Sequence, residues 1–288
     1  MTPVSTRKPR QYHYNQTMNV ENLPILAARD FGHVVDPGRP VLSFAWSAEG
    51  PHRVQGHSHP RGQIIYQSRG VYRVATPLGN WVVPRHQVIW IPPGLPHETF
   101  TNDSAAALML FVDPAHTAQL PLQCMVVAAS TLLCELFERV VSNGNDYPLA
   151  GREERLIAVM LDELGALQPA PLHLPLAQDK RLGRIMDLLI ANPADGRTLD
   201  ELASCCAASS RTLERLFCKQ TGMTFFEWRK QLRLLEAIDL LGQGKTVTSV
   251  ALELGYNSPS AFIAMFRRSL GVCPGQYRNV KADTGGVH

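Results

Sequence analysis

The same helical pattern occurs twice in the last hundred residues of this 288-residue chain. The first copy reads ELASCCAASSRTLERLFCKQTG and ends at Gly222, and the second reads SVALELGYNSPSAFIAMFRRSLG and ends at Gly271. In both copies a short segment with apolar residues at helical spacing is followed by a turn and then by a longer amphipathic segment. In each copy, an Ala of the short segment and a Phe of the long segment occupy packing positions. A repeat of this form predicts two copies of one bihelical unit.

The first copy has the features expected of a unit that reads DNA. Thr198 and Glu201 form a capping box at its start. In the second segment, 209–222, one face is apolar (Leu213, Leu216, Phe217), and long polar side chains occupy the opposite face (Arg211, Glu214, Arg215). Arg can form paired hydrogen bonds with guanine, and Glu can accept one from cytosine. An ordinary helix with a solvated charged face would explain this segment alone, but the second copy favours a helix-turn-helix protein.

Residues 178–280 resemble the DNA-binding domain of the AraC/XylS family of bacterial regulators. The matching residues are Ala203, Ser209, Arg211, Leu213, Arg215, Phe217, Gly222, Arg233, Ala237, Leu240, Leu241, Ala251, Gly255, Tyr256, Phe262, Phe266, Gly271, Pro274, Tyr277 and Arg278. The resemblance implies seven helices, in which a long helix near 225–241 holds two recognition helices in major-groove segments one turn apart, ~34 Å. It also implies that Arg211, Glu214 and Arg215 read bases.

The two units are expected to contribute differently to DNA binding. The residues expected to face DNA are Ser210, Arg211, Thr212, Glu214, Arg215, Lys219, Ser258, Ser260, Ala261, Ala264, Arg267 and Arg268. In the second unit most of these side chains are short, and Pro259 precedes them, unlike family members with long polar groups there. Arg267 and Arg268 can still contact phosphates, which adds affinity without sequence information. We hypothesise that the first unit determines which DNA sequence is bound and that the second unit mostly anchors the protein to the DNA backbone.

Charge and composition agree with a DNA-binding protein that is neither exported nor membrane-bound. Residues 179–281 carry 15 Lys and Arg against 10 Asp and Glu, a net charge of +5 in this segment against +3 for the whole chain. No apolar run reaches the ~18–20 residues that span a bilayer, and the N-terminus lacks a signal-peptide core. The six cysteines form no CxxC pair and fit reduced thiols. We expect a cytoplasmic bacterial protein that associates with the nucleoid when bound to DNA.

The N-terminal part is predicted to be a β-barrel or sandwich. Short apolar or alternating runs separated by Gly, Pro and Asn recur from residue 34 to 112. Helical periodicity follows at 130–141 and 152–167, and three prolines interrupt 168–178. The predicted fold is therefore α+β with two domains. The expected segments are a tail (1–20), a barrel that binds an effector (21–128), a helical dimerisation segment (129–168), a Pro-rich linker (169–178), the double helix-turn-helix domain (179–281) and a tail (282–288).

Histidines within the strand region resemble the two cupin motifs. His57 and His59 alternate around Ser58, Gln63 follows four residues after His59, and His97 follows a Pro-Pro-Gly turn. The resemblance implies a small barrel in which His57, His59, Gln63 and His97 hold a divalent metal. Gln63 replaces the usual Glu, and three imidazoles alone can hold zinc, nickel or iron. The alternative is a relict barrel whose histidines bond to one another or to an anion.

The expected pocket has aromatic walls. Inward-facing aromatic residues are predicted to line the barrel as effector contacts: Trp46, Tyr66, Tyr72 and Trp90, with Trp81 as a further candidate. Each could equally be plain core. By analogy with the AraC family, a small-molecule effector would change how paired reader domains of a homodimer sit on DNA.

Three functions compete at this stage. The first is an effector-controlled transcription regulator, either an activator that contacts RNA polymerase or a repressor, acting on a neighbouring efflux or metabolic gene. The second is a metal-dependent cupin enzyme fused to a DNA-binding domain. The missing Glu and the duplicated helix-turn-helix weigh against it, so no catalytic residue is predicted. The third is an architectural DNA binder without an effector.

Overall fold

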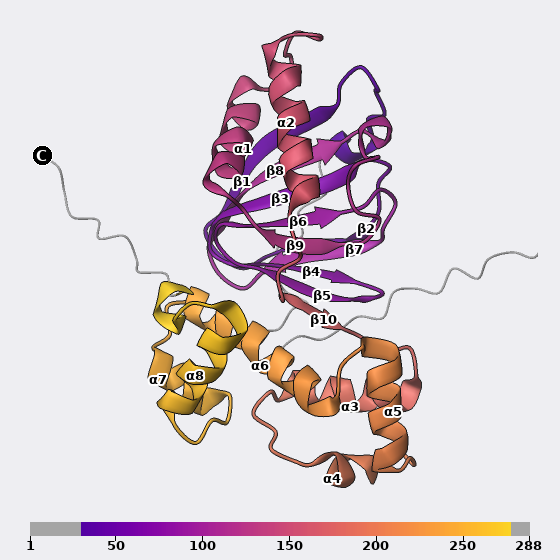
Figure 1. Cartoon of the computed structure of the whole chain (residues 1–288), viewed down its shortest axis with the longest axis vertical. Helices are drawn as coiled ribbons and strands as arrows, with labels where there is room; N and C mark the ends of the chain where they lie inside the picture. Colours follow the sequence, from indigo (N-terminus) through magenta and orange to yellow (C-terminus); the bar gives the residue numbers. More distant parts are fainter. Residues whose placement is uncertain (1–29, 278–288) are drawn as a thin grey trace, which may run out of the picture.

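The computed structural model describes residues 30–277, which form a strand-rich N-terminal part and an all-helical C-terminal part (Figure 1). The two predicted tails, the start of the predicted barrel (21–29) and Arg278 lie outside the described residues. None of the helices within 30–277 is long and apolar enough to cross a membrane.

Two five-stranded antiparallel sheets build the N-terminal domain. The first has the order β1-β8-β3-β6-β9 and the second the order β10-β5-β4-β7-β2. The strands are β1 (Val41–Ala48), β2 (His52–His57), β3 (Gly62–Arg69), β4 (Tyr72–Thr76), β5 (Gly79–Val83), β6 (Gln87–Ile91), β7 (His97–Thr101), β8 (Ala105–Val112), β9 (Met125–Ala128) and β10 (His173–Pro175). The predicted barrel-like fold is confirmed, and the proline-containing run supplies β10 at a sheet edge, where a missing backbone donor does little harm.

Two helices cover the outer face of the first sheet. They are α1 (Thr131–Asn143) and α2 (Arg152–Ala166), close to the predicted ranges. Successive strand residues point to opposite faces, so Ile64 lies in the cluster with these helices and Ile65 lies in the barrel core. The first sheet is therefore apolar on both faces, which explains why its strands read as continuous hydrophobic runs.

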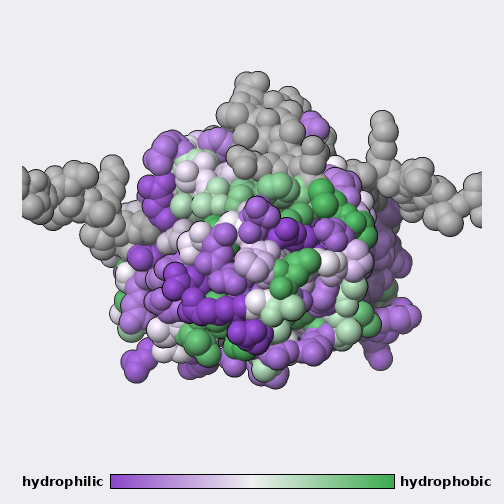
Figure 2. All heavy atoms as spheres, turned by 90° about the horizontal axis from the view of Figure 1, so that it is seen from above, coloured by the Kyte–Doolittle hydropathy of each residue, from purple (hydrophilic) through white to green (hydrophobic). Residues whose placement is uncertain are grey.

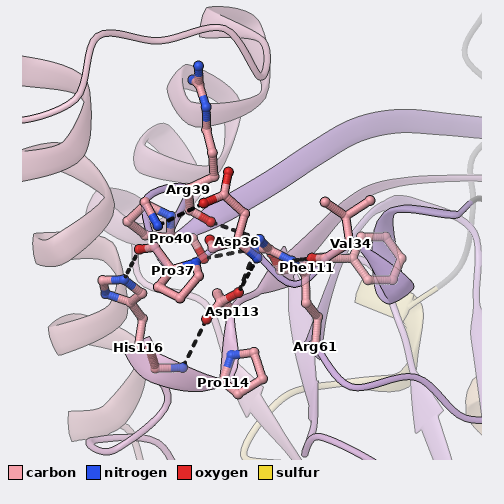
Figure 3. Close-up of polar contacts among 12 residues, drawn as sticks. Val34, Asp36, Pro37, Arg39, Pro40, Arg61, Phe111, Asp113, Pro114 and His116 are labelled. Atoms are coloured by element: carbon pink, nitrogen blue, oxygen red, sulfur yellow. Dashed lines mark hydrogen bonds and ion pairs between the residues drawn. The ribbon is translucent and has the colours of Figure 1, made fainter.

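A buried arginine fastens the segment that precedes β1 and includes the 3-10 helix η2 (Asp30–His33). Arg61 is 0% exposed, and its Nη2 lies 3.3 Å from Oδ2 of the buried Asp113, just before the 3-10 helix η3 (Pro114–His116). The guanidinium also donates to five backbone carbonyls, those of Val34, Asp36, Arg39, Pro40 and Phe111 (Figure 3). Residues 34–40 are thus held at one end of the barrel.

The C-terminal domain has six α-helices and one short 3-10 helix between Lys180 and Tyr277. They are α3 (Lys180–Ala191), α4 (Leu199–Ala203), α5 (Ser210–Thr221), α6 (Phe225–Gly242), α7 (Val247–Glu253), α8 (Pro259–Leu270) and η4 (Pro274–Tyr277). The helix α6 joins a unit made of α3–α5 to a unit made of α7 and α8 beneath the barrel (Figure 1). The two predicted bihelical units and the long helix between them are confirmed.

The two domains share one continuous core along α6. Arg73 on β4 bonds Glu236 and Asp239 at 3.2 and 3.0 Å, and all three are almost fully buried. A Cβ on Gly242 would come within 2.5 Å of Val71, so the helix backbone lies directly on the barrel. Trp228 donates its indole N–H to the carbonyl of Pro175 at 2.8 Å. The helix that joins the two reader units is therefore docked on the barrel's second sheet.

Candidate DNA-reading surface and barrel site

The helix α5 is rigid on one side and free on the other. Ser209 caps its start by accepting from the Thr212 amide, and Gly222 ends it in the left-handed conformation, with φ of 72°. Leu213, Leu216 and Phe217 are buried. Arg211 and Arg215 are exposed on the opposite side, and toward residues 30–277 neither makes a side-chain hydrogen bond or ion pair. Two free guanidinium groups on a fixed helix suit base recognition.

Glu214 has a structural contact that sequence reasoning missed. Its Oε1 accepts a hydrogen bond at 3.3 Å from the backbone N–H of Phe225, the first residue of α6. The N-terminus of a helix carries unsatisfied donors and a partial positive charge, so a carboxylate there is stabilising. The contact fixes the turn between α5 and α6. Base reading by Glu214 remains a prediction.

The helix α8 repeats the geometry of α5 at a constant offset. Both helices have 12 residues, both begin after a capping Ser (Ser209 and Ser258), and both end at a left-handed Gly (Gly222 and Gly271). The buried residues correspond as well, with Phe262 and Phe266 in place of Leu213 and Phe217. The remaining residues predicted to face DNA, Ser260, Ala261, Ala264, Arg267 and Arg268, are exposed. The two recognition helices can therefore be compared position by position.

The helix α6 sets the relation between the two units. Its 18 residues span about 27 Å, at ~1.5 Å per residue. Phe225 and Trp228 pack on Phe217 of the first unit, with ring centroids 5.5 and 5.9 Å away. Farther along, Arg233 stacks over the ring of Tyr256 of the second unit at 5.7 Å. A rigid spacer of this length suits recognition helices about one DNA turn apart.

Three histidines come together inside the barrel. His57 and His97 are opposite each other on β2 and β7, and His59 follows β2. One candidate ligand atom from each lies within 4.8 Å of the others. His59 and His97 are 4% and 3% exposed. Burial lowers the pKa of His97 to about 3 and lowers that of His59, so both rings are neutral at neutral pH. The cluster could hold a metal ion.

The hydrogen bonds around the three rings fix where their lone pairs point. Each Nδ1 lies beside a backbone carbonyl oxygen: His57 beside Gln55 at 2.8 Å, His59 beside Arg61 at 2.6 Å and His97 beside Leu95 at 2.8 Å. A carbonyl only accepts, so in a neutral ring Nδ1 carries the proton and Nε2 keeps the lone pair. A metal-binding histidine commonly donates the N–H of its other ring nitrogen to a backbone carbonyl or a carboxylate, which fixes the orientation of the ring.

Gln63 completes this arrangement as a fourth polar group. Its Oε1 lies 3.3 Å from Nε2 of His59 and 3.1 Å from Nε2 of His97. With the protons on Nδ1, three hydrogen-bond acceptors face one another, Nε2 of His59, Nε2 of His97 and Oε1 of Gln63, and none of them carries a proton to donate. A cation at the centre resolves this, and so does reversal of the amide, which would turn its NH₂ group to the rings. The donor set of three imidazoles and one amide oxygen fits zinc, nickel or iron.

The interior next to the histidines is aromatic. His59 meets the ring of Phe111 at 5.3 Å, and Phe111 stacks on Phe44 at 6.1 Å. Trp46 packs edge-on against Tyr72 at 5.3 Å, and the Tyr72 hydroxyl is hydrogen-bonded to Thr99 at 3.2 Å. Trp46 and Tyr72 thus lie where predicted. Phe44, Thr99 and Phe111 were missed because the pairing register that brings them to the histidines cannot be read from one strand alone.

Tyr66 and Trp90 do not line the barrel interior, so this part of the sequence prediction is wrong. Tyr66 stacks on Phe137 of α1 with ring centroids 5.4 Å apart. Trp90 belongs to the same outer cluster and donates its indole N–H to the carbonyl of Pro121 at 2.7 Å. Tyr66 and Trp90 are each adjacent in their strand to residues that point inward, such as Ile65, and therefore point outward themselves. The strands are apolar on both faces, so hydrophobicity did not reveal their phase. Trp81, the further candidate, is in the interior core.

The fold and these two sites define a protein with a sensor-like barrel joined to a double helix-turn-helix reader. Family models match both parts: the AraC-like ligand binding domain over residues 43–160 and a helix-turn-helix domain over residues 202–279. The HTH-type transcriptional regulator NimR of Escherichia coli is 34% identical over 221 residues, which cover 77% of this chain and 81% of that protein. The chain belongs to the AraC family of transcription regulators.

A second relative matches with similar coverage. The thermoregulatory protein LcrF of Yersinia pestis is 26% identical, over 84% of this chain and 88% of that protein. The HTH-type transcriptional regulator RipA of Corynebacterium glutamicum is 35% identical over a shorter stretch, 38% of this chain and 34% of that protein. The prediction of a DNA-binding regulator of the AraC type is confirmed by these likenesses.

Proposed function

We propose that this regulator reads its operator mainly through α5, with α5 and α8 in adjacent segments of the major groove. The observation that carries this is the pair of exposed guanidinium groups of Arg211 and Arg215, which have no hydrogen-bond or ion-pair partner among residues 30–277, on a helix whose other face is buried. Ser210, Thr212 and Lys219 lie beside them on α5. Arg267 and Arg268, in the last turn of α8, contact phosphates.

Two arginine variants test this division of labour. Arg211→Ala should relax the preference at one operator position by about 1–3 kcal/mol, because a bidentate guanine contact is lost. Arg268→Ala should weaken all duplexes alike and lower the salt slope of binding by about one. Competition binding with operators mutated one base pair at a time measures both. Equal loss of base preference in the two variants would refute the proposal that α5 reads bases while Arg268 on α8 contacts only phosphates.

The barrel interior is the proposed effector site. Trp46 and Tyr72 supply aromatic walls, Thr99 supplies a polar group beside Tyr72, and Gln63 supplies one beside the histidines. This combination suits a small, partly apolar molecule. Such an effector would act on DNA binding through the contact between the barrel and α6.

We also propose that His57, His59 and His97 hold a divalent metal as part of this site, with the Gln63 oxygen as a fourth ligand. Support comes from the Nδ1–H bonds to backbone carbonyls, which leave the Nε2 lone pairs facing inward. When bound, the ion would offer a Lewis-acidic position to a donor atom of the effector. Gln63 provides no carboxylate to take up a proton, so we propose a sensing role without turnover.

Metal analysis of protein purified without chelators or nickel resin tests this part. We expect about one zinc, nickel or iron per chain, and loss of that metal in His97→Ala. His116→Ala is the matched control, because this half-buried histidine lies outside the cluster. Metal-free wild-type protein that also fails to bind added Zn²⁺ would rule the metal out and leave the DNA-binding proposal intact.

The proposed assembly is a homodimer formed through α1 and α2. Their outer faces carry exposed apolar side chains, Leu132 at 52% and Val159 at 45%. Figure 2 views the barrel end, where apolar patches are interspersed with hydrophilic residues. Leu132→Glu with Val159→Glu should give a monomer in sedimentation experiments, and an unchanged mass would contradict this interface. The dimer would act in the cytoplasm, contacting RNA polymerase if it activates.

A further inference from the structure

The two recognition helices present opposite chemistry at equivalent positions. Because α5 and α8 share length, caps and buried residues, each outward residue of one has a counterpart in the other. The pairs are Arg211 with Ser260, Thr212 with Ala261, Glu214 with Ile263, and Arg215 with Ala264. At three of these four positions a hydrogen-bonding side chain of α5 is replaced on α8 by an apolar one, and at the fourth Arg211 is replaced by the short hydroxyl side chain of Ser260.

This apolar surface of α8 is exposed and bordered by positive charge. Ala261 and Ala264 are exposed, and Ile263 is 37% exposed. Arg267 and Arg268 follow in the last turn of the same helix and are also exposed. Short side chains allow the helix to approach the floor of a groove closely, while the two arginines can reach the phosphates at its rim. The family model covers this helix, so its DNA-facing role does not depend on the small residues.

We infer that α8 reads the 5-methyl groups of thymines through Ala261, Ile263 and Ala264. In the major groove the thymine methyl is the one apolar feature of the base edges, and apolar side chains are its natural contacts. The operator would then be asymmetric, with a guanine-containing block under α5 and a thymine-containing block under α8. This inference rests on the proposed placement of both helices in the major groove, and it gives the second unit a reading role beyond anchoring.

Replacing thymine by uracil tests the inference, because it removes only the methyl group. An operator is first selected from random duplexes with the full chain, and the thymines of each block are then replaced by uracil separately. We expect about four-fold weaker binding for each methyl lost from the block under α8, the equivalent of one buried methylene-sized group. Replacement in the other block should change binding less than two-fold.

Two variants assign the sensitive block to its helix. Ala264→Ser keeps the size of the side chain but places a hydroxyl at the contact, so the uracil effect should shrink. Arg215→Ala, at the equivalent position of α5, should leave the uracil effect unchanged and relax base preference at one position of the other block. A specific operator that tolerates uracil in both blocks would overturn the inference and spare the proposed function. A chain that selects no sequence would overturn the proposed function, and this inference with it.

Discussion

Arg211 and Arg215 are positioned by the residues on the opposite, buried face of α5. Their guanidinium groups are exposed and bond to no residue in the described part of the chain, because the buried Leu213 and Phe217 hold the other side of α5 in place. The same periodicity allowed both arginines to be identified from the sequence. Glu214 shows the limit of that reasoning, since its bond to the Phe225 amide joins two helices whose crossing the sequence does not encode locally.

The Glu214 contact leads to a stability prediction. Glu214→Ala should lower the free energy of unfolding by about 1 kcal/mol, because the N-terminus of α6 loses a charged acceptor. Glu214→Gln keeps an acceptor oxygen and should lose less. Urea unfolding of the three proteins measures the effect. If Glu214→Ala is as stable as wild type, the contact between Glu214 and the Phe225 amide does not contribute to the free energy of unfolding.

His173 leads to a pH prediction. It stacks on Trp81 at 4.3 Å, its Nε2 has no hydrogen-bond partner among residues 30–277, and burial lowers its pKa to about 4. Between pH 6.5 and 4 the unfolded chain therefore binds a proton that the folded chain does not, so stability falls as pH falls through this window. The largest slope is about 1.4 kcal/mol per pH unit.

The variant His173→Phe isolates this contribution. Phenylalanine can keep the stacking on Trp81 but cannot take up a proton. Unfolding free energies measured between pH 7 and 4.5 should fall less steeply in the variant than in wild type. His59 and His97 are present in both proteins, so their shared contribution cancels. Parallel curves for the two proteins would mean that His173 is protonated equally in the folded and unfolded chain.

At the scale of elements, α6 has two roles: it joins the two helix-turn-helix units and it docks on the barrel. Only the first role could be predicted from the sequence. Its contacts with Phe217 and Tyr256 were foreseeable from the repeat and from the family resemblance. Its docking on the barrel was not, because the partners Arg73 and Glu236 are 163 positions apart and neither stands out in composition. Burial raises the pKa of Glu236 even beside Arg73, which shows how strongly the site disfavours uncompensated charge.

Removing Arg73 should therefore loosen α6 from the barrel. Arg73→Met leaves Glu236 and Asp239 buried without their cation, and we expect a loss of about 3–5 kcal/mol in unfolding free energy. Hydrogen exchange should rise most in α6. Arg69→Met is the matched control, because Arg69 ends β3 in the other sheet and forms an exposed pair with Glu49, so its loss should cost under about 1 kcal/mol. Similar losses in both variants would contradict a special role for the α6 contact.

At the scale of the whole molecule, β4 contacts both the barrel interior and α6. Tyr72 faces the barrel interior and Arg73, the next residue, faces α6. Under the proposed function, an effector bound in the barrel would therefore act on α6 through adjacent residues of one strand, without an intervening loop. The change of periodicity predicted a strand-rich part followed by a helical part, but residues 173–175 of the expected linker form β10 of the barrel's second sheet. The core that the two parts share was not predictable, because it depends on which outward strand residues meet which helix face.

The central claim is that α6 holds two recognition helices on one side of DNA. Selection of the full chain on random duplexes, followed by sequencing, tests it most directly. The account predicts enrichment of two conserved blocks with centres about ten base pairs apart, one helical turn. Enrichment of a single block, of two blocks at variable spacing, or of no sequence at all would contradict it.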